Sequence, residues 1–158
     1  MAIEIERKFL IKKDIWEKVA KDKSNYIKQG YLTTDPNLTI RVRLKDQQAF
    51  LTIKGKTKGA SRPEYEYEIP KDDASELLDN FSTNSIEKTR YEIIDDGNLW
   101  EVDQFHGDNE GLIVAEIELL DENQKFSLPP WIDLEVTSDS RYYNSNLVQN
   151  PYKHWIKR

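Results

Sequence analysis

Two glutamates and a lysine near the N-terminus have types and spacing that could bind a metal ion. Glu4, Glu6 and Lys8 alternate with mostly apolar residues. As a strand, this run places its charged side chains on one face, because successive side chains point to opposite faces. Two carboxylates this close repel each other unless a cation lies between them. Mg²⁺ and Mn²⁺ prefer oxygen ligands, so the spacing predicts a divalent metal site.

The same alternation of charged and apolar residues recurs along most of the chain. Within each run, like charges occupy successive positions on one face: Arg41 and Arg43; Glu64, Glu66 and Glu68; Lys88 and Arg90; Glu101 and Asp103; Glu116 and Glu118. The solvated face of an antiparallel sheet explains any single run of this kind. A face built only for solubility more often mixes signs within a strand. The combined pattern therefore favours a ligand over simple solvation.

A polyphosphate bound together with metal ions would need both signs of charge. Carboxylates would hold the metal ions, while arginine and lysine side chains would hold phosphate oxygens. If the sheet closes with its charged face inward, these rows line a polar tunnel. The apolar face then points outward and requires helices over it.

The elements that must position these residues are mostly strands. Strands are predicted at residues 2–10, 27–33, 38–45, 48–55, 62–69, 86–94, 98–105, 112–119 and 132–137. Helices are predicted from a capping box at Asp14, from Pro70, and in a short C-terminal segment from Ser140 or Pro151. Residues 95–98 carry a hairpin signal. The sequence has no linker or repeat, so we predict a single domain over residues 1–158. We expect it to be mainly β with flanking helices, in a closed antiparallel barrel or a highly curved sheet.

Composition narrows the possible function classes. The 158 residues carry a net charge of −6, which disfavours general nucleic-acid binding. There is no cysteine, which suits a reducing compartment, and no apolar run approaches the ~20 residues that a membrane span requires. We expect no signal peptide, because the sequence reaches Glu4 before any apolar run develops. We expect a cytoplasmic protein whose partner is a small polyanion, with no membrane or nucleic acid, and outward tyrosine and tryptophan side chains leave room for a homodimer.

The charged runs also resemble the signatures of a known family. Glu4-Ile5-Glu6-Arg7-Lys8 is similar to the ExExK signature of the CYTH superfamily, the triphosphate tunnel metalloenzymes. The resemblance continues, in order and over essentially the whole chain, at 39–43, 51–55, 64–68, 88–91, 100–103, 115–119 and 134–137. It implies an eight-stranded antiparallel β-tunnel with a charged interior, acting on triphosphate compounds with Mg²⁺ or Mn²⁺.

The resemblance also assigns roles to particular residues. It implies a metal site made by Glu4, Glu6, Glu116 and Glu118, with Asp103 and Glu66 in support. It implies a phosphate clamp made by Lys8, Arg41, Arg43, Lys54, Lys88 and Arg90. We expect Lys8, Arg41, Lys88 and Tyr31 to take part in catalysis, with Tyr31 or Lys88 assisting the attacking water if either points inward.

The chain looks most like short bacterial proteins that act on inorganic tripolyphosphate. The predicted reaction is attack of water on a terminal phosphoryl group. Nucleoside or thiamine triphosphatase activity is the alternative, followed by class IV adenylyl cyclase activity. The cyclases share a His-Phe pair ahead of their glutamates, whereas only Met1, Ala2 and Ile3 precede Glu4 here. A polyphosphate-binding module without turnover is the alternative outside the enzymes.

Overall fold

The computed structural model describes residues 3–82 and 84–155, apart from the side chain of Thr34. Strands dominate it, as the alternation predicts. The elements in chain order are β1 (Ile3–Ile11), α1 (Lys13–Trp16), β2 (Ser24–Asp35), β3 (Leu38–Lys45), β4 (Gln48–Gly55), β5 (Ser61–Ile69), α2 (Lys71–Phe81), β6 (Ser85–Asp95), β7 (Asn98–Phe105), η1 (Gly107–Asn109), β8 (Ile113–Glu118), β9 (Ile132–Glu135), η2 (Ser140–Tyr142), α3 (Asn144–Gln149) and η3 (Tyr152–His154).

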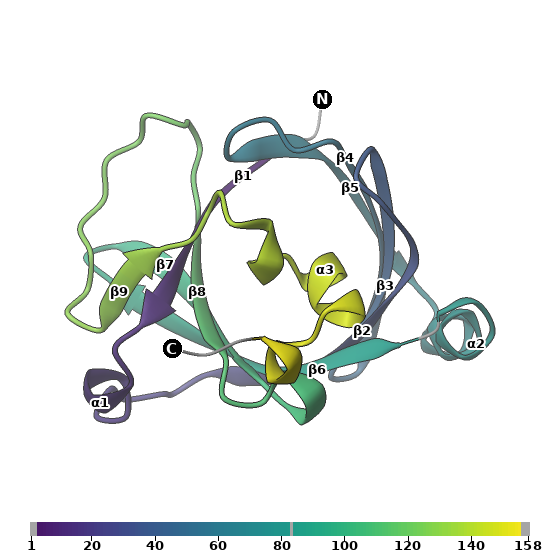
Figure 1. Ribbon diagram of the computed structural model, residues 1–158, viewed down its shortest axis with the longest axis horizontal. Coiled ribbons are helices and arrows are strands. Elements are labelled where there is room, and N and C mark those ends of the chain that lie inside the picture. Colours follow the sequence, from purple (N-terminus) through teal and green to yellow (C-terminus); the bar gives the residue numbers. More distant parts are fainter. Residues whose placement is uncertain (1–2, 83, 156–158) are drawn as a thin grey trace.

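The strands form one antiparallel sheet that closes on itself. Their order is β5-β4-β3-β2-β6-β7-β8-β1-β9, and a further pairing of β1 with β5 joins the two ends. Eight strands therefore make a barrel, seen end-on in Figure 1, while β9 lies outside it against the second half of β1. The predicted closed eight-stranded antiparallel barrel is confirmed. The charges of β9 do not enter the barrel, because Glu135 forms an ion pair with the outward-facing Arg7.

Turn chemistry sets the hairpin between β6 and β7. Asp96 and Gly97 both have positive φ angles, 49° and 77°. Two-residue loops of this kind match the right-handed twist of paired strands, and glycine adopts the second conformation without strain. The hairpin predicted at residues 95–98 is present.

The apolar outer face is covered as predicted over β2, β3 and β4. Ala74 and Leu78 of α2 pack against Val42 and Ala49 of the sheet. Gly30 permits this close approach, since an added Cβ there would lie 2.7 Å from Leu78 Cδ2.

The first predicted helix is shorter than its capping box indicates. α1 is a single turn after Lys12, and no side chain caps its N-terminus. Trp16 is buried in the core, and its carbonyl oxygen accepts hydrogen bonds from the Val19 backbone N–H (3.0 Å) and from Lys21 Nζ (2.7 Å) in a tight turn that ends the helix. The capping-box prediction at Asp14 was therefore wrong, because Asp14 lies inside this turn and no side chain caps it.

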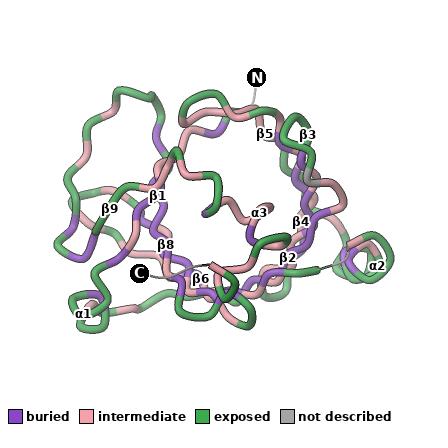
Figure 2. The backbone as a smooth tube through the Cα atoms, in the orientation of Figure 1, coloured by how far each residue is buried: buried purple, intermediate pink, exposed green. Residues whose placement is uncertain are grey.

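The inner face is charged as predicted, but not along its whole length. Inward side chains near one end are apolar and pack against Tyr142 and Leu147 of the C-terminal segment. Figures 1 and 2 show α3 lying within the ring of strands. The predicted C-terminal helical segment is thus present as η2, α3 and η3, and it fills one end of the barrel.

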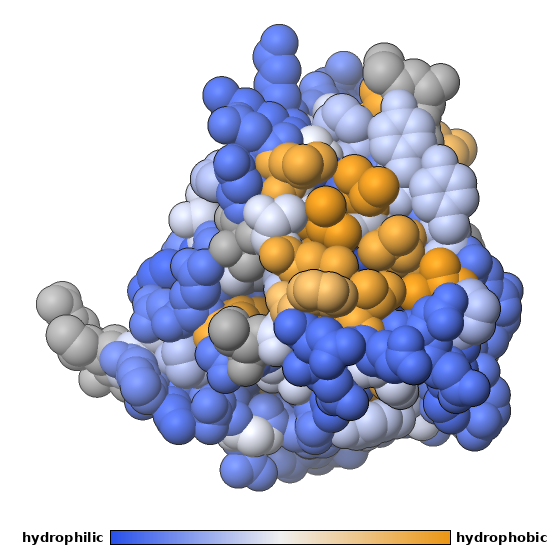
Figure 3. Space-filling view, turned by 90° about the vertical axis from the view of Figure 1, so that its right-hand side faces the viewer, coloured by the Kyte–Doolittle hydropathy of each residue, from blue (hydrophilic) through white to orange (hydrophobic). Residues whose placement is uncertain are grey.

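Part of the outer surface stays apolar. Figure 3 shows hydrophobic side chains gathered on the side that carries α2 and β3. Leu38 and Phe81 are 45% and 65% exposed. The possible homodimer stays a prediction. No helix in the described part of the chain is long and apolar enough to cross a membrane.

Candidate functional site

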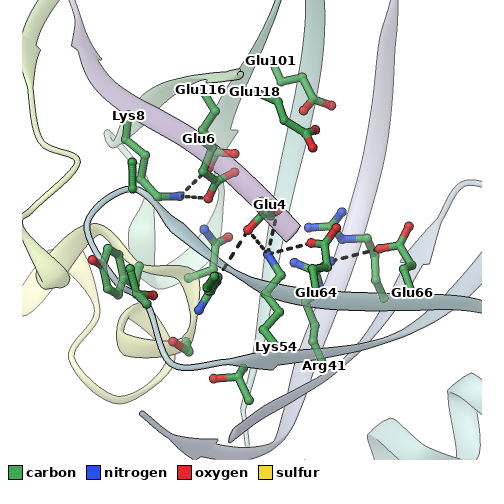
Figure 4. A pocket seen from close by; sticks show the side chains of 18 of the residues that line it. Glu4, Glu6, Lys8, Arg41, Lys54, Glu64, Glu66, Glu101, Glu116 and Glu118 are labelled. Atoms are coloured by element: carbon green, nitrogen blue, oxygen red, sulfur yellow. Dashed lines mark hydrogen bonds and ion pairs between the residues drawn. The ribbon is translucent and has the colours of Figure 1, made fainter. Parts of the chain in front are cut away.

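The inward charged side chains line one cavity of about 240 Å³. Strand alternation places them there, because every second residue of a strand faces the barrel interior and each predicted residue occupies such a position. The cavity wall includes every predicted site residue except Asp103: Glu4, Glu6, Lys8, Tyr31, Arg41, Arg43, Lys54, Glu66, Lys88, Arg90, Glu116 and Glu118. Figure 4 shows several of them pointing toward one another from different strands.

Carboxylates gather on the wall formed by β1, β7 and β8. Glu6 lies directly opposite Glu118 across the β1–β8 pair, and Glu101 lies opposite Glu116 across β7–β8. Like charges facing each other across strands are destabilising. Burial, together with the charges of Glu4 and neighbouring glutamates, raises the pKa of Glu118 to about 7. This wall holds a surplus of negative charge.

Two lysines partly neutralise this carboxylate wall. Lys8 Nζ lies 2.8 Å from Glu116 Oε1 and 3.2 Å from Glu6 Oε1. Burial alone would lower the pKa of Lys8, but these carboxylates hold it above its usual value. Lys54 Nζ similarly lies 2.9 Å from Glu4 Oε1. These ammonium groups sit among the predicted metal ligands.

The opposite wall carries a surplus of positive charge. Arg41 donates to Thr52 (3.2 Å), but its Nε is buried without a hydrogen-bond partner in the described part of the chain. Arg43 Nε donates to the amide oxygen of Gln29 at 2.8 Å. Burial lowers the pKa of Arg43 to about 9, and the charges of Arg41 and Arg90 act in the same direction. An anion bound here would satisfy these groups, which fits the predicted phosphate clamp.

Asp103 lies behind this wall and holds two of its cations. Its Oδ1 accepts from Arg90 Nε at 2.7 Å, and its Oδ2 accepts from Lys88 Nζ at 2.7 Å. Burial would raise the pKa of Asp103, but Arg90 and Lys88 hold it at about 2. Burial lowers the pKa of Lys88 to about 7, with Arg90 and Arg43 adding to that effect and Asp103 opposing it.

The structure separates two predicted metal ligands from the carboxylate wall. Both oxygens of Asp103 are engaged by Lys88 and Arg90. Glu66 Oε2 accepts from Thr52 Oγ1 at 2.9 Å and lies 3.4 Å from Arg41. Both carboxylates therefore contact side chains of the cationic wall.

Sequence reasoning missed several groups at the cavity. Glu64 and Glu101 belong to rows that the alternation identified, so their signal was present. Gln29 is fully buried and shares the inward parity of Tyr31, whose hydroxyl accepts from it at 2.9 Å. Asn144, on the C-terminal segment, had no periodic signal in the sequence.

The carboxylate wall has the donor chemistry for a divalent cation. Its oxygen ligands suit Mg²⁺ or Mn²⁺, and a bound cation would offset the facing pair of Glu6 and Glu118. Within residues 3–82 and 84–155, no three carboxylate or imidazole side chains already stand in a metal-binding arrangement.

Comparison with known proteins agrees with this geometry. The model of the CYTH domain family matches residues 2–152. An inorganic triphosphatase from Acetivibrio thermocellus is 49% identical over 156 residues, covering 98% of this chain and 99% of the relative. One from Nitrosomonas europaea is 41% identical, covering 77% and 83%. A crystal structure of an inorganic triphosphatase superposes with a TM-score of 0.65 at 34% identity, covering 100% of this chain and 99% of the other.

Proposed function

The chain belongs to the CYTH domain family, and we propose on this premise that it is a metal-dependent hydrolase of inorganic tripolyphosphate. The observation that carries the proposal is one cavity lined by both signs of charge, with Glu6, Glu116 and Glu118 gathered on β1 and β8 and the arginines on β3 and β6. A polyanion with bound metal ions matches both walls. The likeness to two inorganic triphosphatases supports the choice of substrate.

The cationic wall would bind and orient the substrate. Arg41, Arg43 and Arg90 would contact phosphate oxygens, and the unpartnered Nε of Arg41 would gain an acceptor. Phosphoryl transfer spreads negative charge over the transferred group, so fixed cations stabilise its transition state. The substrate chain would lie against this wall with its terminal phosphorus open to water.

The carboxylate wall would hold the metal. Glu4, Glu6, Glu116 and Glu118 are the proposed ligands, and Mg²⁺ or Mn²⁺ bound there would polarise phosphate oxygens. Asp103 and Glu66 would instead anchor cations of the clamp, for the reasons given above.

Lys88 is the proposed acceptor of the water proton. Its depressed pKa of about 7 leaves part of the amine neutral near neutral pH. The water oxygen would attack the terminal phosphorus, the phosphoanhydride bond would break, and phosphate and pyrophosphate would leave. The Tyr31 hydroxyl contacts Gln29 and not Lys88 directly, which favours an indirect role for this hydroxyl in catalysis.

Phosphate release tests the proposal. We would compare tripolyphosphate, ATP, thiamine triphosphate and pyrophosphate, each with Mg²⁺, Mn²⁺ or EDTA. Glu6→Gln should abolish release, while the control Glu110→Gln, at an exposed position, should leave it unchanged. Preference for ATP or thiamine triphosphate would contradict the substrate assignment. Tight tripolyphosphate binding with no release from any compound would instead indicate a binding module.

A further inference from the structure

The C-terminal segment contributes a side chain to the cavity. Tyr142 and Leu147 anchor this segment in the apolar end of the barrel, where Leu147 is 1% exposed. Asn144 lies between these anchors and borders the cavity. The apolar contacts thus fix where this asparagine meets the inner wall.

The amide oxygen of Asn144 receives two hydrogen bonds from the barrel. Lys88 Nζ donates to it at 3.0 Å, and Gln29 Nε2 donates at 3.2 Å. The other amide atom of Gln29, its oxygen, accepts from Arg43 Nε at 2.8 Å. One asparagine therefore connects the C-terminal segment to two cations of the phosphate-binding wall.

The lysine end of this network depends on few partners. Lys88 and Asp103 are each 1% exposed, so few groups are available to replace a lost acceptor. A lysine stem has four rotatable methylene groups, and an ammonium is oriented by the acceptors around it. Two acceptors from different elements, Asp103 on β7 and Asn144 on the C-terminal segment, fix where Nζ lies.

We propose that Asn144 is a positioning residue for the reaction, holding Lys88 and, through Gln29, Arg43 in the geometry that hydrolysis needs. This inference rests on the proposed function. Without the asparagine oxygen, Lys88 would keep its bond to Asp103 but lose the contact that draws Nζ toward the cavity wall. Gln29 would lose one of its two acceptors and be held by the Tyr31 hydroxyl alone, which would loosen the position of the amide oxygen that accepts from Arg43.

Asn146 provides a matched control on the same segment. Its Nδ2 donates to the carbonyl oxygen of Ser140 at 2.7 Å, within the segment itself. Replacing Asn146 therefore removes the same kind of side chain and a local hydrogen bond without touching the cationic wall. A purely structural role for Asn144 predicts that the two alanine variants behave alike.

The experiment is steady-state hydrolysis of tripolyphosphate with Mg²⁺ by the full-length protein. We expect Asn144→Ala to lower kcat roughly 10- to 100-fold with little change in KM, because a small displacement of a reacting group has effects of that order. Asn146→Ala should keep both constants. Equal behaviour of the two variants would overturn the proposal.

A conservative variant separates positioning from packing. Asn144→Asp keeps an oxygen that accepts from Lys88 and Gln29 but adds negative charge near an anionic substrate. It should raise KM and move the pH dependence of kcat to higher pH, because a carboxylate beside Lys88 raises the pKa of that amine. A kcat as low as that of Asn144→Ala at every pH would contradict the role assigned to the acceptor oxygen.

Two outcomes need separate interpretation. If Asn144→Ala does not fold, Asn144→Leu retains the side-chain volume without the acceptor and replaces it in the comparison. Failure of both to fold, with Asn144→Asp and Asn146→Ala folded and active, would mean a structural role and overturn the inference. An inactive wild-type protein would instead defeat the proposed function, so the two failures are distinguishable.

Discussion

Replacing Asp103 with asparagine should destabilise the protein strongly. The carboxylate is 1% exposed and bonds Lys88 and Arg90 through both oxygens. The variant keeps the size of the side chain but removes its charge. Arg90 cannot lose its proton, whereas Lys88, with a pKa of about 7, can discharge. The uncompensated charge that remains is therefore mainly that of Arg90.

The expected loss follows from this burial. Removing one partner of a buried ion pair costs about 3–5 kcal/mol, and for a chain of this length that corresponds to a fall in Tm of about 6–20 °C. Arg90 retains Glu101 at 3.2 Å, which places the value toward the lower end of the range. The assay is urea unfolding at neutral pH followed by tryptophan fluorescence.

An exposed pair of the same type is the control. Asp108 lies 2.9 Å from Lys153, and both side chains are more than half exposed. Exposed pairs contribute about 0–1 kcal/mol, so Asp108→Asn should change the free energy of unfolding very little. If Asp103→Asn costs no more than Asp108→Asn, the argument that Asp103 holds two buried cations is refuted.

Three further predictions concern acid, packing and charge. The pKa of Asp103 is lowered from 3.8 to about 2, so its charge contributes about 2 kcal/mol to the free energy of unfolding above pH ~4. This contribution is lost as the pH falls toward ~2. When stability is measured against acid pH, Asp103→Asn should lack this loss. Leu147→Ala should cost about 2–5 kcal/mol by urea unfolding, against about 0.5 or less for Leu134→Ala, because Leu134 is 68% exposed. Glu118→Gln should raise Tm in EDTA, since it removes charge from a like-charged wall, and should reduce the Tm increase caused by Mg²⁺; an unchanged response to Mg²⁺ would contradict its role as a ligand.

Strand alternation made most of this site predictable. A side chain's face follows from its parity, so Arg41 and Arg43 on β3 could be assigned to one surface from sequence alone. Barrel closure followed from the resemblance to a family, because alternation alone left a closed barrel or a highly curved sheet open. Once the charged residues face inward, the apolar residues that alternate with them must face outward.

Position along the barrel axis was not predictable in the same way. It depends on strand register, which alternation leaves open, and register decides that Glu6 faces Glu118 while Asp103 is turned to Arg90. The docking of the C-terminal segment inside the barrel could not be predicted for another reason. Asn144 comes close to Lys88 only because Leu147 finds an apolar pocket inside the barrel, and neither short helices nor loops carry a periodic signal for such docking.

The arrangement of charge explains how one barrel interior holds so many ionised groups. Lys8 and Lys54 stand among the carboxylates, and Asp103 stands behind the cations, so each wall carries counter-charges that reduce its own repulsion. Neither wall is fully neutralised, since Glu118 remains crowded by like charge and Arg41 Nε lacks an acceptor among the described residues. What remains on each wall is the charge that a metal–polyphosphate complex would complement, because the metal ion supplies the missing positive charge and the phosphate oxygens the missing acceptors.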